Sequence, residues 1–199
     1  MRKTLKKTIT LPPPVTRGRM SLEKALLVRR SVREFAATPL TGRQISQLLW
    51  AAQGVVTREG FRTAPSAGAL YPLELYAVKA DGMFHYQPRR HRLSRLSDLD
   101  LRPPLFRATF DQKMVLEAPC TFVIAAVDER IARKYGRARC VRYVDLEVGH
   151  AAQNLLLEVV ALGLGSVAVA AFKDAGVKKA LGLPADQRPV YLLPVGRPR

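Results

Sequence analysis

The sequence predicts an α+β fold in which helices pack on an antiparallel-rich central sheet. Helical and strand-like segments are mixed along the 199 residues, but they do not alternate regularly as they would in a doubly wound parallel sheet. Two strand-like runs within residues 73–87 meet at Asp81-Gly82, a dipeptide typical of a two-residue hairpin turn, and a hairpin makes its strands antiparallel. The length is that of one domain, which we assign to residues 21–199.

Residues 1–20 are expected to form an extended arm, because the consecutive prolines Pro12–Pro14 exclude a helix. Such an arm would be free or would wrap a partner. Its basic start precedes no apolar run long enough for a secretion signal, and the longest apolar run, residues 155–172, is interrupted by Glu158 and by Gly and Ser residues. We expect no signal peptide or membrane span. The two cysteines form no disulfide framework, which favours a cytoplasmic location.

Two helices are expected after the arm. Ser21 is placed to cap the first, which begins at Leu22. The second spans residues 41–54, where Thr41 and Gln44 have capping-box spacing and Gly54 ends the helix. Its buried stripe consists of apolar residues at helical spacing, namely Ile45, Leu48, Leu49 and Ala52.

The second half of the chain predicts three buried strands and two helices. The continuous apolar run 120–127 is typical of a fully buried strand. A long helix is expected from Asp145 to Leu162, and its second half is apolar on most sides, which implies burial in a core or a subunit interface. Residues 166–172 and 189–196 predict two more buried strands, with a short helix at 174–181 between them.

The charge balance is strongly basic, with 33 Lys and Arg against 16 Asp and Glu and a formal net charge of +17. Such a field attracts phosphates, acidic peptides and nucleic acid. A nucleic-acid-binding protein is therefore one alternative, although the basic residues are spread over the chain and form no recognised binding motif. The chain has no G-x-S-x-G nucleophile motif, and its three histidines lack metal-ligand spacing, so we expect no metal site.

Two segments point to a bound ligand. "RRSVREF", residues 29–35, crowds guanidinium groups around a hydroxyl near a helix end, which suits a phosphate; the alternative is a solvated basic face. "RTAPSAGALYPLE", residues 62–74, contains far more small residues and prolines than a turn requires. Small residues allow backbone to approach a ligand closely, and Gly68 allows it most.

These segments, together with "PLTGRQISQLLWAAQG", "GHAAQNLLLEVVALGLGS" and "PVGRP", resemble the FMN-dependent nitroreductase superfamily. The resemblance is closest to its SagB/ThcOx-type azoline dehydrogenase branch and runs from about residue 20 to the C-terminus. It implies an FMN-dependent oxidoreductase and a homodimer with FMN between the subunits. Hydride would pass through flavin N5 in a ping-pong reaction, from NADH, NADPH or an organic donor to a quinone, a nitro compound or a peptide azoline.

The resemblance also implies which residues bind the cofactor. The positions that match the family's phosphate and ribityl contacts are Arg29, Ser31, Arg33 and Arg197, and those that match its flavin-edge loop are Pro65, Ser66, Ala67 and Gly68. Gln153 and Asn154 match polar cofactor contacts on the long helix. The backbone contacts on the reactive side of the ring match Val169, Ala170 and Ala171. Gln153 and Asn154 could equally be buried amides with satisfied hydrogen bonds.

Lys134 and Tyr135 match the proton-handling pair of the azoline oxidisers. Azoline oxidation requires a base that removes a proton from carbon, whereas simple quinone or nitro reduction requires no such side chain. The alternative is a solvated helical face, since Arg130, Lys134 and Arg137 recur at helical spacing. A second alternative for the whole chain is a flavin-binding protein without turnover, such as a scaffold subunit of a peptide-modifying complex.

Overall fold

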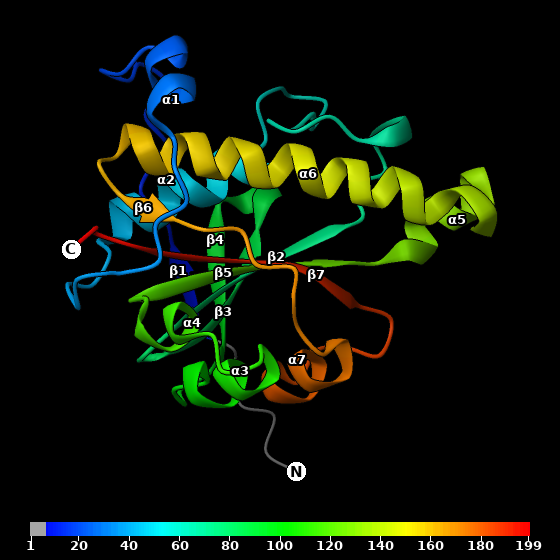
Figure 1. Ribbon diagram of the computed structural model, residues 1–199. Coiled ribbons are helices and arrows are strands. Elements are labelled where there is room, and N and C mark those ends of the chain that lie inside the picture. Colours follow the sequence, from blue (N-terminus) through cyan, green and yellow to red (C-terminus); the bar gives the residue numbers. More distant parts are fainter. Residues whose placement is uncertain (1–6) are drawn as a thin grey trace.

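One sheet organises the molecule (Figure 1). In the computed structural model, which describes residues 7–199, its strands follow the order β1-β4-β3-β2-β5-β7-β6. Every ladder between them is antiparallel, which confirms the predicted α+β class. The strands are β1 Thr8–Thr10, β2 Leu73–Lys79, β3 Gly82–Gln87, β4 Arg92–Ser97, β5 Cys120–Ala126, β6 Gly165–Ser166 and β7 Arg188–Gly196.

The predicted hairpin and buried strand lie in the middle of this sheet. β2 and β3 pair up to Lys79 opposite Gly82, so Asp81 stands in the turn as expected. β2 also pairs with β5, which in turn pairs with β7. All seven residues of β5 are buried, because β5 has a paired strand on each side and side chains packed on both faces.

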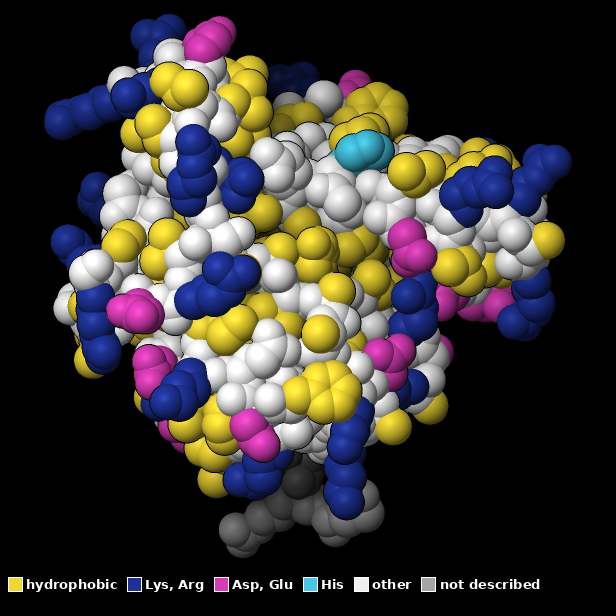
Figure 2. Space-filling model, in the orientation of Figure 1, with side chains coloured by type: hydrophobic (Ala, Val, Ile, Leu, Met, Phe, Trp, Pro, Cys, Tyr) yellow, Lys and Arg dark blue, Asp and Glu magenta, His cyan; other side chains and the backbone are white. Residues whose placement is uncertain are grey.

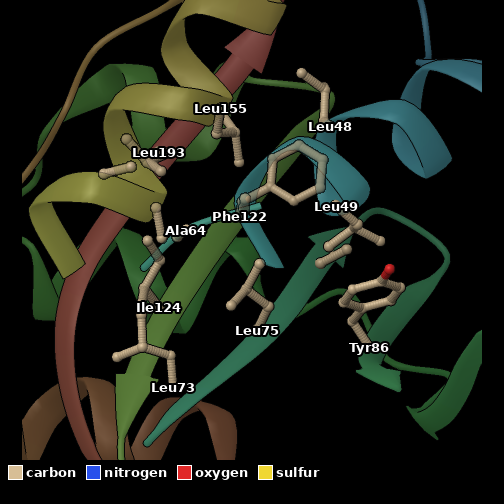
Figure 3. Close-up of a cluster of buried hydrophobic side chains, with 14 of the residues drawn as sticks. Leu48, Leu49, Ala64, Leu73, Leu75, Tyr86, Phe122, Ile124, Leu155 and Leu193 are labelled. Carbon is tan, nitrogen blue, oxygen red and sulfur yellow. The ribbon is translucent and has the colours of Figure 1, made fainter. Parts of the chain in front are cut away.

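Helices cover both faces of the sheet (Figure 1). The long helix α6 lies across one face together with α2, and this side holds the larger core; Figure 3 shows Leu48 and Leu155 reaching toward Phe122 of β5. α3, α4 and α7 cover the other face. The helices are α1 Leu22–Val28, α2 Gly42–Gln53, α3 Arg102–Ala108, α4 Lys113–Glu117, α5 Asp128–Tyr135, α6 Arg137–Ala161 and α7 Asp174–Leu181, with 3-10 turns at Ala67–Ala69 and Pro88–Arg90.

Local capping signals locate the first two helices correctly. Ser21 accepts a hydrogen bond from the Lys24 amide at 3.2 Å. Thr41 and Gln44 form the complete capping box at the start of α2, with bonds of 2.9 and 3.2 Å. On α1, Ala25 is buried, whereas Leu22 and Leu26 stay 61% and 54% exposed.

Two predicted elements are wrong in extent. α6 begins at Arg137 and not at Asp145, because Cys140 and Val144 continue its buried stripe between arginines. The strand predicted at 166–172 is reduced to the pair Gly165–Ser166 and one bridge from Val169 to Leu192. Beyond Val169 the chain leaves the sheet to begin α7, and its small residues are exposed.

The described part of the arm wraps its own domain. Thr8–Thr10 adds a strand next to β4, and Leu11 is buried. The Val15 amide donates to Gln47 Oε1 at 2.8 Å, and the Ser46 hydroxyl donates to the Pro12 carbonyl at 2.6 Å. The first six residues of the predicted arm lie outside the described residues.

Candidate functional site

The first group of predicted residues gathers near the C-terminal end of α6. Ser31 forms a parallel bridge with Ser166, and the Val32 amide donates to the Ser166 carbonyl at 2.9 Å. The Ala36 amide donates to the Arg197 carbonyl at 2.8 Å. The structure therefore brings the "RRSVREF" segment beside both β6 and the end of the chain.

Two glycines make this close approach possible. A Cβ atom added to Gly165 would lie 2.7 Å from the Val32 Cβ, and one added to Gly196 would lie 2.8 Å from the Phe35 Cβ. Phe35 is fully buried and Val32 half-buried, while Arg33 between them is exposed. Val32 and Phe35 thus anchor the segment and leave the polar side chains around them on the surface.

The polar groups of this cluster suit an anion. Within residues 7–199, Arg29, Arg33 and Arg197 form no ion pair. Arg30 is different, because its guanidinium donates to the carbonyls of Leu27 and Arg29 at 3.0 and 2.8 Å and so faces the end of α1. Ser166 is 2% exposed, and its hydroxyl has no hydrogen-bond partner in the described part of the chain.

Residues 169–171 were predicted to contact the flavin through their backbone, but several of these backbone groups already form hydrogen bonds within the protein. The Val169 amide and carbonyl are both bonded to Leu192, at 2.8 and 3.0 Å, and its side chain is buried. The Ala171 carbonyl accepts a bond from the Gln112 side chain at 2.8 Å. Ala170 is exposed, and it is therefore the residue of this run best placed to meet a ligand.

The second group joins the small-residue loop to the Lys134-Tyr135 pair. Gly68 has a φ of 62°, and a Cβ atom there would lie 2.8 Å from the Tyr135 hydroxyl and 2.9 Å from Lys134 Nζ. Lys134 is exposed; Tyr135 is half-buried and packs edge-on against Tyr143 with ring centroids 5.1 Å apart. The sequence pointed to both segments but not to their contact.

The loop from residue 65 to 71 is held in a strained shape. Gly68, Ala69 and Tyr71 all have positive φ, which is unfavourable for the latter two. The Ser66 hydroxyl oxygen accepts the Tyr71 amide at 2.9 Å, and the Tyr71 hydroxyl accepts the Arg62 amide at 3.1 Å. The Arg62 guanidinium also lies 4.4 Å from the centre of the Tyr71 ring.

Behind this loop lies Glu147, which the sequence analysis missed. Glu147 belongs to α6 and is only 2% exposed. Burial raises the pKa of its carboxyl to about 7, although the Ser66 hydroxyl and the Arg62 guanidinium oppose that rise. A single acid within the apolar stripe of a long helix was the signal that could have identified it.

The two groups lie at opposite ends of α6 (Figure 1). Gly68 contacts the residues just before this helix, and Ser31 pairs with a residue just after it. With 25 residues α6 is about 37 Å long. One chain therefore does not bring the predicted flavin-edge loop to the predicted phosphate residues.

The two amide residues predicted to contact the cofactor from α6, Gln153 and Asn154, differ in their exposure to solvent. The Asn154 side chain donates to the Thr63 carbonyl at 3.2 Å and is half-buried, whereas Gln153 is exposed. Asn154 also lines a cavity of about 1020 Å³. That cavity lies between the arm, α2 and the C-terminal half of α6, and Trp50 and Leu157 contribute to its wall.

Comparison with known proteins identifies the family. The nitroreductase family model matches residues 26–197, which include both groups. The chain belongs to the nitroreductase family. The chain is 44% identical, over 184 residues, to a Methanocaldococcus jannaschii protein named as a nitroreductase. The match covers 89% of this chain and 91% of that protein.

Two further proteins are similar to this chain, one in structure and one in part of its sequence. A crystal structure from Ralstonia eutropha, also under a nitroreductase name, superposes with a TM-score of 0.87 at 28% identity and covers 100% of this chain and 96% of its own. The trifolitoxin-processing protein TfxB of Rhizobium leguminosarum is 30% identical over 122 residues, which are 54% of this chain and 32% of that protein.

Nitroreductases typically use FMN together with NAD(P)H. The first group fits the phosphate of FMN, since its arginines form no ion pair and its buried Ser166 hydroxyl has no hydrogen-bond partner among residues 7–199. The second group fits a flat ring, because its exposed loop carries no bulky side chain at Gly68 or Ala69.

No described helix is long and apolar enough to cross a membrane, and no described cluster of three His, Cys, Asp or Glu could hold a metal ion.

Gly68→Val is expected to weaken flavin binding by at least about tenfold, or about 1.4 kcal/mol, while the protein still folds. The new side chain would overlap Tyr135 and Lys134 and would oppose the positive φ. The fold should survive because the loop lies on the surface. Circular dichroism and flavin retention on a desalting column measure both effects.

The matched control is Gly42→Val, because a side chain at Gly42 meets nothing within 4 Å. It should retain flavin as the native protein does. A Gly68→Val protein that is folded and retains its full complement of flavin would show that this loop does not contact the flavin.

Proposed function

We propose that this nitroreductase is an FMN-dependent oxidoreductase. It would take hydride from NADH, NADPH or an organic donor and pass it to a quinone, a nitro compound or a peptide azoline. The observation that carries the proposal is that one chain of this family has both a cluster of arginine and serine side chains at β6 and a small-residue loop beside Lys134. Bound FMN would supply the hydride chemistry, and the protein would bind and orient the reactants.

The chain's own groups have separate roles in this proposal. Arg29, Arg33 and Arg197 would hold the phosphate through charge-assisted hydrogen bonds, assisted by the Ser31 and Ser166 hydroxyls. The loop would admit the ring edge at Gly68.

Lys134 and Tyr135 favour a peptide azoline as a second, narrower candidate for the substrate. Their amine and hydroxyl face the loop at Gly68, where they could remove a proton from a substrate carbon. The partial similarity to a trifolitoxin-processing protein supports this candidate, which would place the chain near the SagB/ThcOx-type branch.

We infer a homodimer with FMN between the two copies, in the cytoplasm. The separation of the two groups along α6 supports a site completed by a second copy. Apolar side chains that no described residue covers also support it: Leu22, Leu26 and Leu27 of α1 and Val141 and Leu146 of α6 are 49–67% exposed. The large groove beside α6 adds a surface that a partner could fill.

The charge of the chain gives less support to nucleic-acid binding. Figure 2 shows Lys and Arg side chains scattered around the visible face, with apolar and acidic side chains between them. A nucleic-acid interface gathers its basic residues along one stripe or groove. The positive net charge instead suits attraction of small anionic ligands to the first group.

The purified protein is expected to be yellow and to release FMN on heating, because among residues 7–199 we assign one cluster to a phosphate and one loop to the flavin ring, and none to the second phosphate and adenine of FAD. It should also consume NADH or NADPH steadily when a quinone is supplied. Chromatography of the released flavin and a coupled absorbance assay measure these properties. Release of FAD would contradict the cofactor assignment, and bound FMN without turnover would favour the scaffold alternative.

Arg29→Ala and Arg33→Ala should each weaken FMN binding by about 1.5–3 kcal/mol, the range for hydrogen bonds to charged groups. Arg30→Ala is the internal control and should have a smaller effect, because its guanidinium is already bonded to backbone carbonyls. Fluorescence titration of the apoproteins with FMN gives the three dissociation constants. If Arg30 were the most sensitive of the three, this account of the segment would be wrong.

Lys134→Ala and Tyr135→Phe should slow oxidation of an azoline peptide by about 10²–10⁴-fold, the usual contribution of a proton-transferring group. Quinone reduction should change little, since it needs no such group. Arg133→Ala is the control, because the Arg133 side chain is 80% exposed and its ion pair with Glu129 is a long one, at 3.9 Å. Equal loss of both activities in the Lys134 and Tyr135 variants would indicate a structural role for the pair.

A further inference from the structure

Arg130 of α5 links its helix to two other parts of the chain, the small-residue loop and the central sheet. Its guanidinium donates to the Tyr71 carbonyl at 2.9 Å, at the end of the loop. The same guanidinium forms an ion pair with Glu74 of β2. The proposed chemistry gives Arg130 no part, so these contacts call for a separate explanation.

Glu74 is a firmly held partner for Arg130. It lies on β2 with its side chain only 14% exposed, and it bonds the His85 ring of the neighbouring strand β3 at 2.6 Å. Burial alone would raise the pKa of Glu74, but the hydrogen bond with His85 and the charge of Arg130 outweigh burial and lower that pKa. The carboxylate is therefore ionised near neutral pH, and it gives Arg130 a fixed negative charge on the sheet.

The end of the loop is a place that needs such a hold. Tyr71 has a φ of 49°, and a strained conformation of this kind persists only where the surrounding structure imposes it. Arg130 bonds the Tyr71 carbonyl, and the Val127 amide donates to the next carbonyl, that of Pro72, at 2.9 Å. Two successive carbonyls at the exit of the loop are thus bonded to the beginning of α5.

The helix α5 has little apolar packing of its own. Figure 1 shows it at the end of α6, away from the middle of the sheet. Of its eight residues only Ile131 is buried. At its first turn, Arg188 of β7 bonds the Asp128 carboxylate at 2.9 and 3.1 Å. Polar contacts therefore do much to set where α5 lies.

Arg130 and Lys134 are four residues apart and share one face of α5. The loop meets this face twice, because Tyr71 bonds Arg130 and a Cβ atom on Gly68 would lie 2.9 Å from Lys134 Nζ. A contact that fixes Arg130 against the loop therefore also fixes how close Lys134 comes to it.

We propose that Arg130 is a positioning residue, which fastens the loop to α5 and so sets the distance between Gly68 and Lys134. Its planar guanidinium fork suits this role, because it can donate to a carboxylate and to a carbonyl at once, whereas a lysine ammonium is a single compact charge. Like charges at Arg130 and Lys134 repel each other, and Glu74 offsets that repulsion. The inference rests on the proposed function only where it assigns this loop to the flavin site.

Hydrogen exchange of the flavin-free full chain tests the proposal on peptides that cover residues 62–74. The loop amides of Ala69, Leu70 and Tyr71 are bonded to loop acceptors at 2.9–3.4 Å, so a looser loop exchanges them faster. In Arg130→Met, which keeps an unbranched side chain without charge, these amides should exchange several-fold faster than in the native protein. Arg130→Lys should recover part of the protection. Arg133→Met is the matched control, since the Arg133 side chain lies one turn further along α5 and is 80% exposed; it should exchange as the native protein does.

Native exchange in Arg130→Met would overturn the proposal, because the stem of the side chain would then be sufficient. Equal acceleration in Arg133→Met would overturn it too, as would an Arg130→Lys protein that exchanges as fast as Arg130→Met. If Arg130→Met does not fold, Glu74→Gln removes the charge that fixes Arg130 and should also accelerate loop exchange; the native rate there would again overturn the proposal. Because no flavin is present, these results do not depend on whether the protein binds FMN.

Discussion

The packing of α6 along one face of the sheet is the constraint on which the rest of the structure depends. Its buried stripe runs from Cys140 to Val159 and is continuous with the core around β5. Each fully buried Val or Leu contributes about 1.5–3 kcal/mol, so this stripe matches the whole net stability of a typical domain. A helix fixed so firmly also fixes its two ends. One end positions Lys134 and Tyr135 at the small-residue loop, and the other positions β6 against the basic segment.

The two ends differ in physical character. The basic segment is a surface cluster in which Arg29 and Arg33 form no ion pair within the described part of the chain, and Val32 and Phe35 hold it against two glycines. The loop is a strained turn in which Tyr71 and Arg62 contact each other, and the buried acid Glu147 lies behind it. The first suits a charged phosphate and the second suits a flat ring, with Lys134 and Tyr135 beside it, which is the division expected of an FMN site.

Local signals predicted the hairpin, the capping box of α2, the buried strands β5 and β7 and the helix α7. They missed short elements such as β1, β4, α3 and α4, whose structure depends on pairing or packing with distant segments. The start of α6 was not predicted, because only two buried residues, Cys140 and Val144, mark its apolar stripe there and arginines surround them. The sequence did identify the two segments that form the candidate site, residues 29–35 and 62–74. The sequence did not reveal the contact of Gly68 with Lys134, because tertiary packing creates it. The burial of Glu147 was indicated only by its place within the apolar stripe of α6.

The central claim is that a second copy completes the flavin site, and mixed dimers test it most directly. One chain would carry Arg29→Ala and Arg33→Ala, and the other Gly68→Val; each variant alone should bind FMN weakly. If the site joins the basic segment of one copy to the loop of the other, the mixed dimer regains one intact site. Our account predicts that refolding the two variants together restores tight binding of about one FMN per mixed dimer. No recovery would contradict it, because a site within one chain would stay defective in both copies.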